Sequence, residues 1–172
     1  MALLGLKKRA LCNLLLVSVA ALGILLDQLT KALAVRYLLP IDTFPIWDGV
    51  LHLTYVENRG AAFGMLADNR WVFMIVSTVA IAALAVWFFF FIKKPTYLTT
   101  VAISMIISGG IGNMIDRVAI GYVVDFVDFR LINFAVFNVA DIFVCVGAGL
   151  LVLGILLEPD PKKAARGKGG DE

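Results

Sequence analysis

Long apolar runs alternate with polar connections along this chain, and the runs are about as long as a helix that crosses a bilayer. Such a helix needs about 20 residues. Four segments reach or approach that length: residues 10–26, 71–92, 97–115 and 137–157. The fourth run carries Asp141 inside it. We therefore predict an integral membrane protein that is all-α within the bilayer, with four transmembrane helices.

The two longest polar connections, roughly residues 27–70 and 116–136, contain stretches that favour strands. The segment 50–57 is rich in β-forming residues and partly alternates between apolar and polar positions. The segment 122–129 has the same character. We expect these connections to form a small β-rich platform that rests on the helix ends.

Composition agrees with a membrane location. Hydrophobic residues make up 61% of the 172 residues and charged residues 16%, against roughly 45–50% and 25% in soluble domains. The net charge of +2 does not suggest a nucleic-acid partner. We predict one membrane-embedded domain over residues 1–157, followed at 158–172 by a disordered cytoplasmic tail rich in proline, glycine and charge.

Basic residues indicate how the helices are oriented, because lysine and arginine concentrate in short cytoplasmic segments. They flank the start of the first apolar run, the end of the second and the end of the fourth: Lys7, Lys8, Arg9, Lys93, Lys94, Lys162, Lys163, Arg166 and Lys168. Both termini are therefore predicted to be cytoplasmic. The β-rich platform is then extracytoplasmic.

Polar residues from three helices should meet at one depth. At about 1.5 Å per residue, Asp27, Asn113 and Asp141 lie roughly 25–28 Å from the cytoplasmic flanks of their helices. The hydrocarbon core is about 30 Å thick, so all three lie at or just below the outer interface. Ionisable groups at such positions are costly and are functional candidates.

The residue types exclude several chemistries. A serine or cysteine nucleophile usually needs a histidine base, and the sole histidine, His52, lies in a strand-like stretch where we expect a structural role. No closely spaced histidines and cysteines suggest a zinc site. We therefore expect neither metal nor cofactor, and the candidate reactive groups are carboxylates.

Two apposed aspartates that share a proton can activate water and protonate a leaving amine. Asp27 has Lys31 four residues later, and Asp116 is followed directly by Arg117, so we expect both aspartates to be ion-paired. Asp125 with Asp141 is then the favoured pair. The candidates from which it is chosen are Asp27, Asp116, Asp125, Asp128 and Asp141.

Two other functions are compatible with parts of the pattern. A small carrier could use Asp141 as a proton or ion site, although carriers usually place such sites near the midplane between repeated halves. A non-catalytic scaffold could bind another helix through the glycines of segment 109–112. The scaffold leaves the intramembrane carboxylates without a role, so the hydrolase is favoured.

Five short motifs occur in order along the chain: Asp-Gln-Leu-Thr-Lys at 27–31, Asn-Arg-Gly-Ala-Ala-Phe at 58–63, Gly-Gly-Ile-Gly-Asn-Met-Ile-Asp-Arg at 109–117, Val-Asp-Phe at 124–126 and Phe-Asn-Val-Ala-Asp at 137–141. Each alone is weak. Together they resemble the bacterial lipoprotein signal peptidases (signal peptidase II), over about residues 24–150.

The resemblance implies an aspartic endopeptidase of the bacterial cytoplasmic membrane. Its partners would be prolipoproteins whose conserved cysteine carries diacylglycerol, cut just before that cysteine, together with membrane lipids and the inhibitor globomycin. Carried over by motif, Asp125 and Asp141 are the catalytic residues. The resemblance further implies residues that line or brace the site (Asn58, Gly60, Asn113, Arg117 and Asn138) and residues that order the helix ends (Asp27, Lys31 and Asp116).

Overall fold

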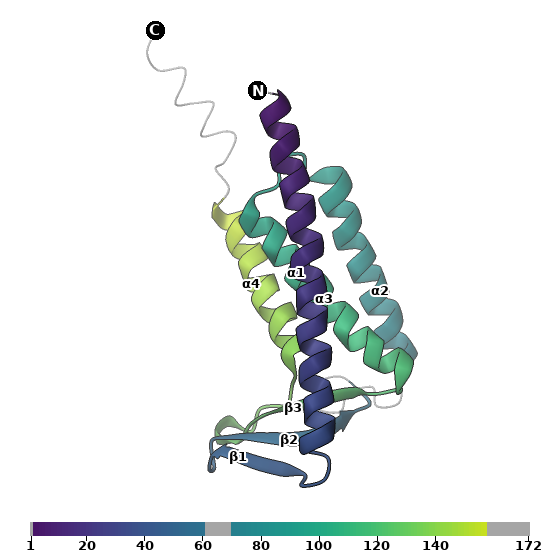
Figure 1. Cartoon of the computed structure of the whole chain (residues 1–172), viewed down its shortest axis with the longest axis vertical. Coiled ribbons are helices and arrows are strands. Elements are labelled where there is room, and N and C mark those ends of the chain that lie inside the picture. Colours follow the sequence, from purple (N-terminus) through teal and green to yellow (C-terminus); the bar gives the residue numbers. More distant parts are fainter. Residues whose placement is uncertain (1, 61–69, 158–172) are drawn as a thin grey trace.

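The computed structural model describes residues 2–60 and 70–157. Within these residues it has four helices long and apolar enough to cross a membrane, and a small sheet at one end of them (Figure 1). The helices are α1 (Ala2–Tyr37), α2 (Arg70–Val86), α3 (Tyr97–Ala119) and α4 (Val139–Leu157). A π-helical turn, η2 (Trp87–Phe91), continues α2. The predicted fold class is confirmed, and the predicted tail at 158–172 lies outside the described residues.

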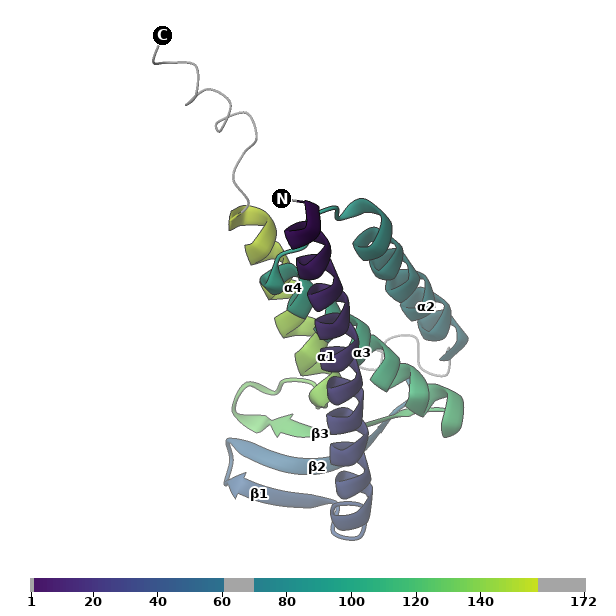
Figure 2. The same cartoon turned by 45° about the horizontal axis from the view of Figure 1, so that its top comes forward.

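Two helices extend beyond the predicted apolar runs. Helix α1 has 36 residues and continues through Asp27 to Tyr37, because Lys31, one turn later, pairs with the Asp27 carboxylate inside the structure. Helix α3 likewise continues past residue 115 to Ala119. Apolar run length therefore underestimated both helices, whose last turns lie beside the platform (Figure 2).

The platform is a three-stranded antiparallel sheet in the order β1-β2-β3, with β1 at Thr43–Trp47, β2 at Leu51–Asn58 and β3 at Val123–Phe129. Both predicted strand segments form strands. The pattern did not predict β1, because Pro45 interrupts it. Proline is tolerated there because β1 is an edge strand.

His52 belongs to the β1–β2 hairpin. Its Nε2 accepts a hydrogen bond from the Gly49 backbone N–H at 3.2 Å, and the Thr43 hydroxyl lies 3.5 Å from Nδ1. Gly49 adopts φ +70°, a conformation that favours glycine. The ring is buried, and these two contacts lie within the hairpin, one with β1 and one with the turn.

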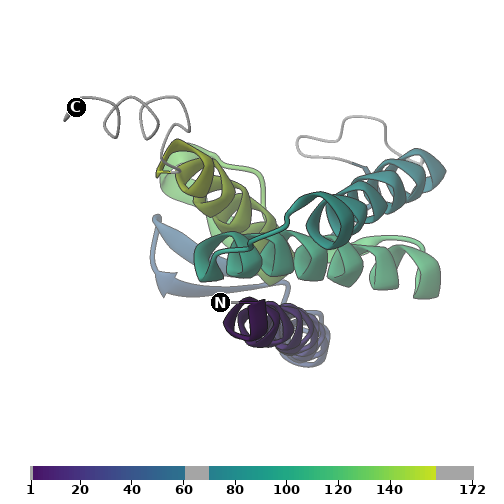
Figure 3. The ribbon, with the colours of Figure 1, turned by 90° about the horizontal axis from the view of Figure 1, so that it is seen from above.

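Helix α3 lies between α1 on one side and α2 and α4 on the other (Figure 3). Two glycines allow close approach to it. A Cβ at Gly109 would clash with the backbone carbonyl of Ala140, and one at Gly112 would clash with the Asp27 carboxylate. The platform is attached by apolar packing of the last turns of α1 against β3, through Ala34, Leu38, Val124 and Phe126.

Candidate active site

Asp125 and Asp141 line one cavity, although they come from different elements. Asp125 lies in β3 with 2% of its surface exposed, and Asp141 lies in the first turn of α4. The cavity has a volume of about 560 Å³. Asn58, Gly60 and Arg117 also line it, so the end of β2, the last turn of α3, β3 and the start of α4 meet there.

Asn138 links the two aspartates. It caps α4: its Oδ1 accepts from the Asp141 backbone N–H at 3.0 Å, and its own backbone N–H donates to Asp141 Oδ2 at 3.1 Å. This reciprocal pair is a capping box. The Asn138 amide nitrogen also donates to Asp125 Oδ1 at 2.6 Å. One buried asparagine therefore orients both carboxylates.

Two further asparagines complete the donors to the aspartates. Asn58 Nδ2 donates to Asp125 Oδ2 at 2.8 Å, while Asn58 Oδ1 accepts from the Gly60 N–H at 3.0 Å. Asn113 Nδ2 donates to Asp141 Oδ1 at 2.8 Å. Each aspartate thus accepts one hydrogen bond from a second asparagine, Asn58 for Asp125 and Asn113 for Asp141, in addition to its bond with Asn138.

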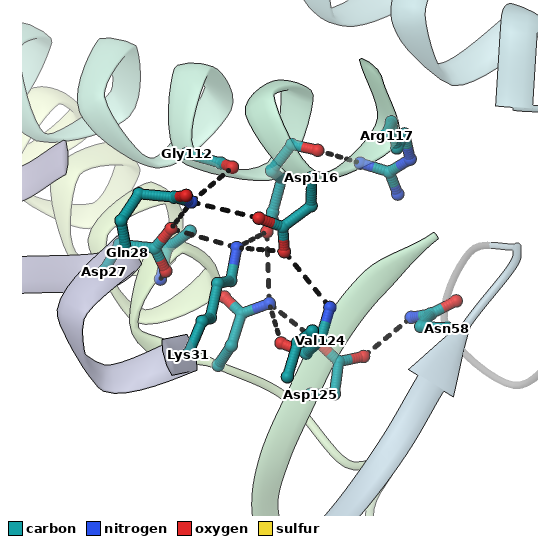
Figure 4. Close-up of polar contacts among 12 residues, drawn as sticks. Asp27, Gln28, Lys31, Asn58, Gly112, Asp116, Arg117, Val124 and Asp125 are labelled. Atoms are coloured by element: carbon teal, nitrogen blue, oxygen red, sulfur yellow. Dashed lines mark hydrogen bonds and ion pairs between the residues drawn. The ribbon is translucent and has the colours of Figure 1, made fainter. Parts of the chain in front are cut away.

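A buried ion cluster braces the site behind these asparagines (Figure 4). Lys31 Nζ lies 2.9 Å from Asp27 Oδ2 and 3.0 Å from Asp116 Oδ2. It also donates to Asn113 Oδ1 at 2.9 Å. This last bond turns the amide nitrogen of Asn113 toward Asp141.

The two carboxylates of the brace hold the backbone just before each cavity aspartate. Asp27 Oδ1 accepts the N–H of Ala140, at 2.9 Å, and Asp116 Oδ2 accepts the N–H of Val124, at 3.1 Å. These residues directly precede Asp141 and Asp125. Lys31 therefore connects two equivalent supports, one for each aspartate.

Gln28 is a member of the brace to which we assigned no role from the sequence. Its Nε2 donates to Asp116 Oδ1 at 3.0 Å, and it lies 3.2 Å from both Asp27 Oδ2 and the Gly112 carbonyl. The i, i+1 spacing from Asp27 carries no helical-face signal. Only the fold, which brings α3 beside α1, indicates this contact.

The expected pairing of Asp116 with Arg117 is wrong. Asp116 pairs with Lys31 of α1. The Arg117 guanidinium points to the cavity side, where it donates to the carbonyls of Asn113 and Gly60 at 3.3 and 3.4 Å and stacks over the Phe73 ring. Neighbours in a helix face directions about 100° apart, so adjacency in sequence did not imply contact.

Burial raises the pKa of the Asp125 carboxyl from 3.8 to about 7. The hydrogen bond from Asn58 opposes this shift, the negative charge of Asp141 adds to it, and the bond from Asn138 opposes it again. A carboxyl with such a pKa exists in both protonation states near neutral pH, as general acid–base chemistry requires.

The rest of the cavity wall is apolar. It includes Phe73 of α2, Phe134 and Phe137 of the β3–α4 connection, and Ile142 and Val146 of α4. The cavity therefore combines a polar end, formed by Asp125, Asp141, Asn58 and Arg117, with an apolar wall. Within residues 2–60 and 70–157, no group of three His, Cys, Asp or Glu side chains could hold a metal ion.

Comparison with known proteins identifies the family. The family model described as signal peptidase (SPase) II matches residues 19–157. The lipoprotein signal peptidase of Caldanaerobacter subterraneus subsp. tengcongensis is 50% identical over 140 residues, covering 81% of this chain and 92% of that protein. That of Clostridioides difficile is 47% identical over 133 residues, covering 76% and 87%.

Two solved structures described as bacterial membrane enzymes share the fold. One has 32% identity and a TM-score of 0.72 over 84% of this chain and 94% of that one. The other has 31% identity and a TM-score of 0.71 over 91% and 93%. The chain therefore belongs to the signal peptidase II family of lipoprotein signal peptidases, bacterial membrane proteases that remove signal peptides from lipoproteins.

Proposed function

We propose that the chain is an aspartic endopeptidase that cuts diacylglyceryl-modified prolipoproteins just before the lipidated cysteine, with Asp125 and Asp141 as its catalytic residues. The observation that carries the proposal is the position of Asn138, which holds both carboxylates at one cavity. No other pair of aspartates in the described residues shares an asparagine and lines that cavity.

The two aspartates have different environments and take different roles. Asp141 accepts hydrogen bonds from Asn113 and from the Asn138 backbone in the first turn of α4, where partial positive charge favours a carboxylate. Asp125 is the more buried group and has the raised pKa. We assign Asp141 as the ionised base and Asp125 as the protonated acid.

In the proposed reaction, Asp141 takes a proton from water as the water oxygen attacks the scissile carbonyl carbon. Asp125 gives its proton to the carbonyl oxygen, which forms a neutral tetrahedral diol. When the C–N bond breaks, the amine receives the proton held by Asp141 and Asp125 regains one from the diol. Arg117 bonds to the Gly60 carbonyl and so holds the segment after Asn58 at the cavity.

The cavity suits a lipid-modified peptide. Its apolar wall would receive the diacylglyceryl chains and the side chains next to the cleaved bond, while the polar end receives the peptide group. We propose that this end faces the outer side of the bacterial cytoplasmic membrane, because lysine and arginine flank the opposite helix ends. The same cavity is the proposed site of globomycin, and Asn58, Gly60, Asn113, Arg117 and Asn138 are its proposed polar lining or support.

The test is gel-shift cleavage of a purified diacylglyceryl-modified prolipoprotein. Asp125→Asn and Asp141→Asn are expected to abolish cleavage. Asp27→Asn should only weaken it, since an amide oxygen can still accept from Ala140. Asp48→Asn is the matched control, because the Asp48 side chain is 97% exposed and lies in the β1–β2 turn. Cleavage retained by either of the first two variants would overturn the assignment.

A further inference from the structure

A second cavity lies at the end of the helices opposite the platform and outside the candidate active site. It has a volume of about 610 Å³ and opens between the first turns of α1 and the start of α3. Its walls include the apolar side chains of Leu4, Leu11 and Tyr97. Three lysines also line it: Lys7, Lys8 and Lys94. The cavity therefore combines positively charged lysines with an apolar wall.

These lysines have no acidic partner in the part of the chain that the structure describes. Every carboxylate there belongs to the platform or to the brace and cavity described above: Asp27, Asp42, Asp48, Glu57, Asp116, Asp125, Asp128 and Asp141. Lys8 faces an aromatic ring instead, with its Nζ 5.7 Å from the centroid of Tyr97. No carboxylate of the described residues therefore neutralises the positive charge of the cavity.

The neighbouring Arg9 behaves differently. It donates to the carbonyls of Phe88, Phe89 and Ile92 at the end of η2 and stacks over the Phe88 ring. Arg9 thereby attaches the start of α1 to the α2–α3 connection, which carries Lys94. This attachment holds the two sides of the cavity together and leaves the lysines available.

The start of α3 adds to the positive potential. Thr96 caps that helix, its hydroxyl accepting from the Thr99 N–H at 3.0 Å, and Tyr97 of the first turn lines the cavity. Helix N-termini carry partial positive charge and favour anions. Basic pockets between membrane helices bind the headgroups of anionic lipids.

We propose that this cavity binds one anionic glycerophospholipid from the leaflet at the N-terminal end of α1. Its phosphate lies among Lys7, Lys8 and Lys94, and an acyl chain lies along Leu4 and Leu11. Charge complementarity selects an anion, and the apolar wall selects an amphiphile over free phosphate. The site is separate from peptide cleavage.

The test is lipid titration of the purified full chain in detergent, read by native mass spectrometry and thermal unfolding. Dioleoyl phosphatidylglycerol is expected to bind one to one and raise the melting temperature. Dioleoyl phosphatidylcholine should bind at least tenfold more weakly, and inorganic phosphate should leave the melting temperature unchanged. Equal binding of the two lipids, or an equal effect of phosphate, overturns the proposal.

Variants separate a built site from general attraction to a charged surface. Lys8→Gln and Lys94→Gln should each weaken phosphatidylglycerol binding about fivefold, the factor for one basic residue at an anionic surface. Lys93→Gln removes the same charge from an exposed side chain that does not line the cavity, and should change binding less than twofold. Equal effects of Lys93→Gln and Lys94→Gln overturn the proposal.

Gly5 offers a test that leaves charge unchanged. Gly5 lines the cavity, and no atom lies within 4 Å of a Cβ built there, so a larger side chain meets no steric obstacle and Gly5→Leu is expected to take up part of the cavity. Weaker lipid binding with unchanged prolipoprotein cleavage is expected. Unchanged lipid binding overturns the proposal.

A cross-linking experiment tests a different occupant of the cavity. Carbodiimide cross-linking of Lys8 or Lys94 to carboxylates of residues 158–172 also overturns the proposal, because the occupant is then the chain's own tail.

Discussion

Asn138 and Asp141 hold each other at the start of α4, each side chain accepting the backbone N–H of the other, at 3.0 and 3.1 Å. A capping box usually serves only to start a helix. Here the cap does not use the side-chain nitrogen of Asn138, and this nitrogen donates a hydrogen bond to Asp125 Oδ1 at 2.6 Å. The start of a membrane helix and the alignment of two carboxylates therefore depend on one side chain.

Substitutions of Asn138 should separate these two tasks. Asn138→Ala loses the cap and the donor to Asp125, so its unfolding free energy should fall by about 2–4 kcal/mol. Asn138→Ser keeps a capping oxygen and should recover about 1 kcal/mol of that loss. Both should cleave about 100-fold more slowly, because the carboxylates are misaligned. Thermal unfolding and cleavage assays test this, and wild-type turnover by Asn138→Ser would contradict it.

The pH profile of cleavage should report the proton on Asp125. Because its pKa is raised to about 7, the acid is lost as pH rises through that value, and kcat/KM should fall on the alkaline side near pH 7. Asn58→Ala removes a hydrogen bond that lowers this pKa, so the descending limb should move to higher pH. Asp48→Asn, at the exposed hairpin turn, should leave the limb in place.

The same group makes stability depend on pH in a defined direction. A carboxyl whose pKa is raised by folding contributes most below its unfolded value of 3.8, and the contribution is lost as pH rises to about 7. This difference amounts to about 4 kcal/mol. The melting temperature of Asp125→Asn relative to wild type should therefore rise between pH 4 and 7 and then level off. A constant difference across that range would contradict the assignment.

Much of the fold could be predicted because membrane helices and strands leave local signals. Apolar runs located the four helices, and β-branched stretches located β2 and β3. The common depth of Asp27, Asn113 and Asp141 also followed from helix geometry, and all three belong to the connected polar network.

What could not be predicted depends on contacts between distant segments. The partner of Asp116 is Lys31, 85 positions earlier, and no local spacing indicates that pair. The role of Gln28 has the same origin. The capping box was available in principle, since Asn138 and Asp141 are three residues apart just before an apolar run. Its extension to Asp125 required the strand to be in place.

Gly112 should be intolerant of even one methyl group. A Cβ there would clash with the Asp27 carboxylate, which must stay in place to bond Lys31 and the Ala140 N–H. Gly112→Ala is expected to destabilise the fold by about 1–3 kcal/mol. Gly149→Ala in α4 is the control, because its Cβ meets nothing within 4 Å and helix propensity favours alanine by up to about 1 kcal/mol. Equal melting temperatures for the two variants would contradict the close contact.

Lys31 should matter more to stability than any exposed cation of α1. Its side chain is 4% exposed and faces two carboxylates, so Lys31→Met leaves Asp27 and Asp116 buried together without a counter-charge. Breaking a buried pair in this way costs about 3–5 kcal/mol. Arg36→Met, an exposed position on the same helix, should cost less than 1 kcal/mol.

A double variant distinguishes uncompensated charge from lost packing. Asp27→Asn in the Lys31→Met background removes one of the two unpaired carboxylates, while the amide oxygen can still accept from Ala140. The double variant should therefore be more stable than Lys31→Met alone, by thermal unfolding at pH 7. If it is instead less stable by the sum of the two single effects, Lys31 acts through packing, and the ionic brace contributes no coupling between the supports of Asp125 and Asp141.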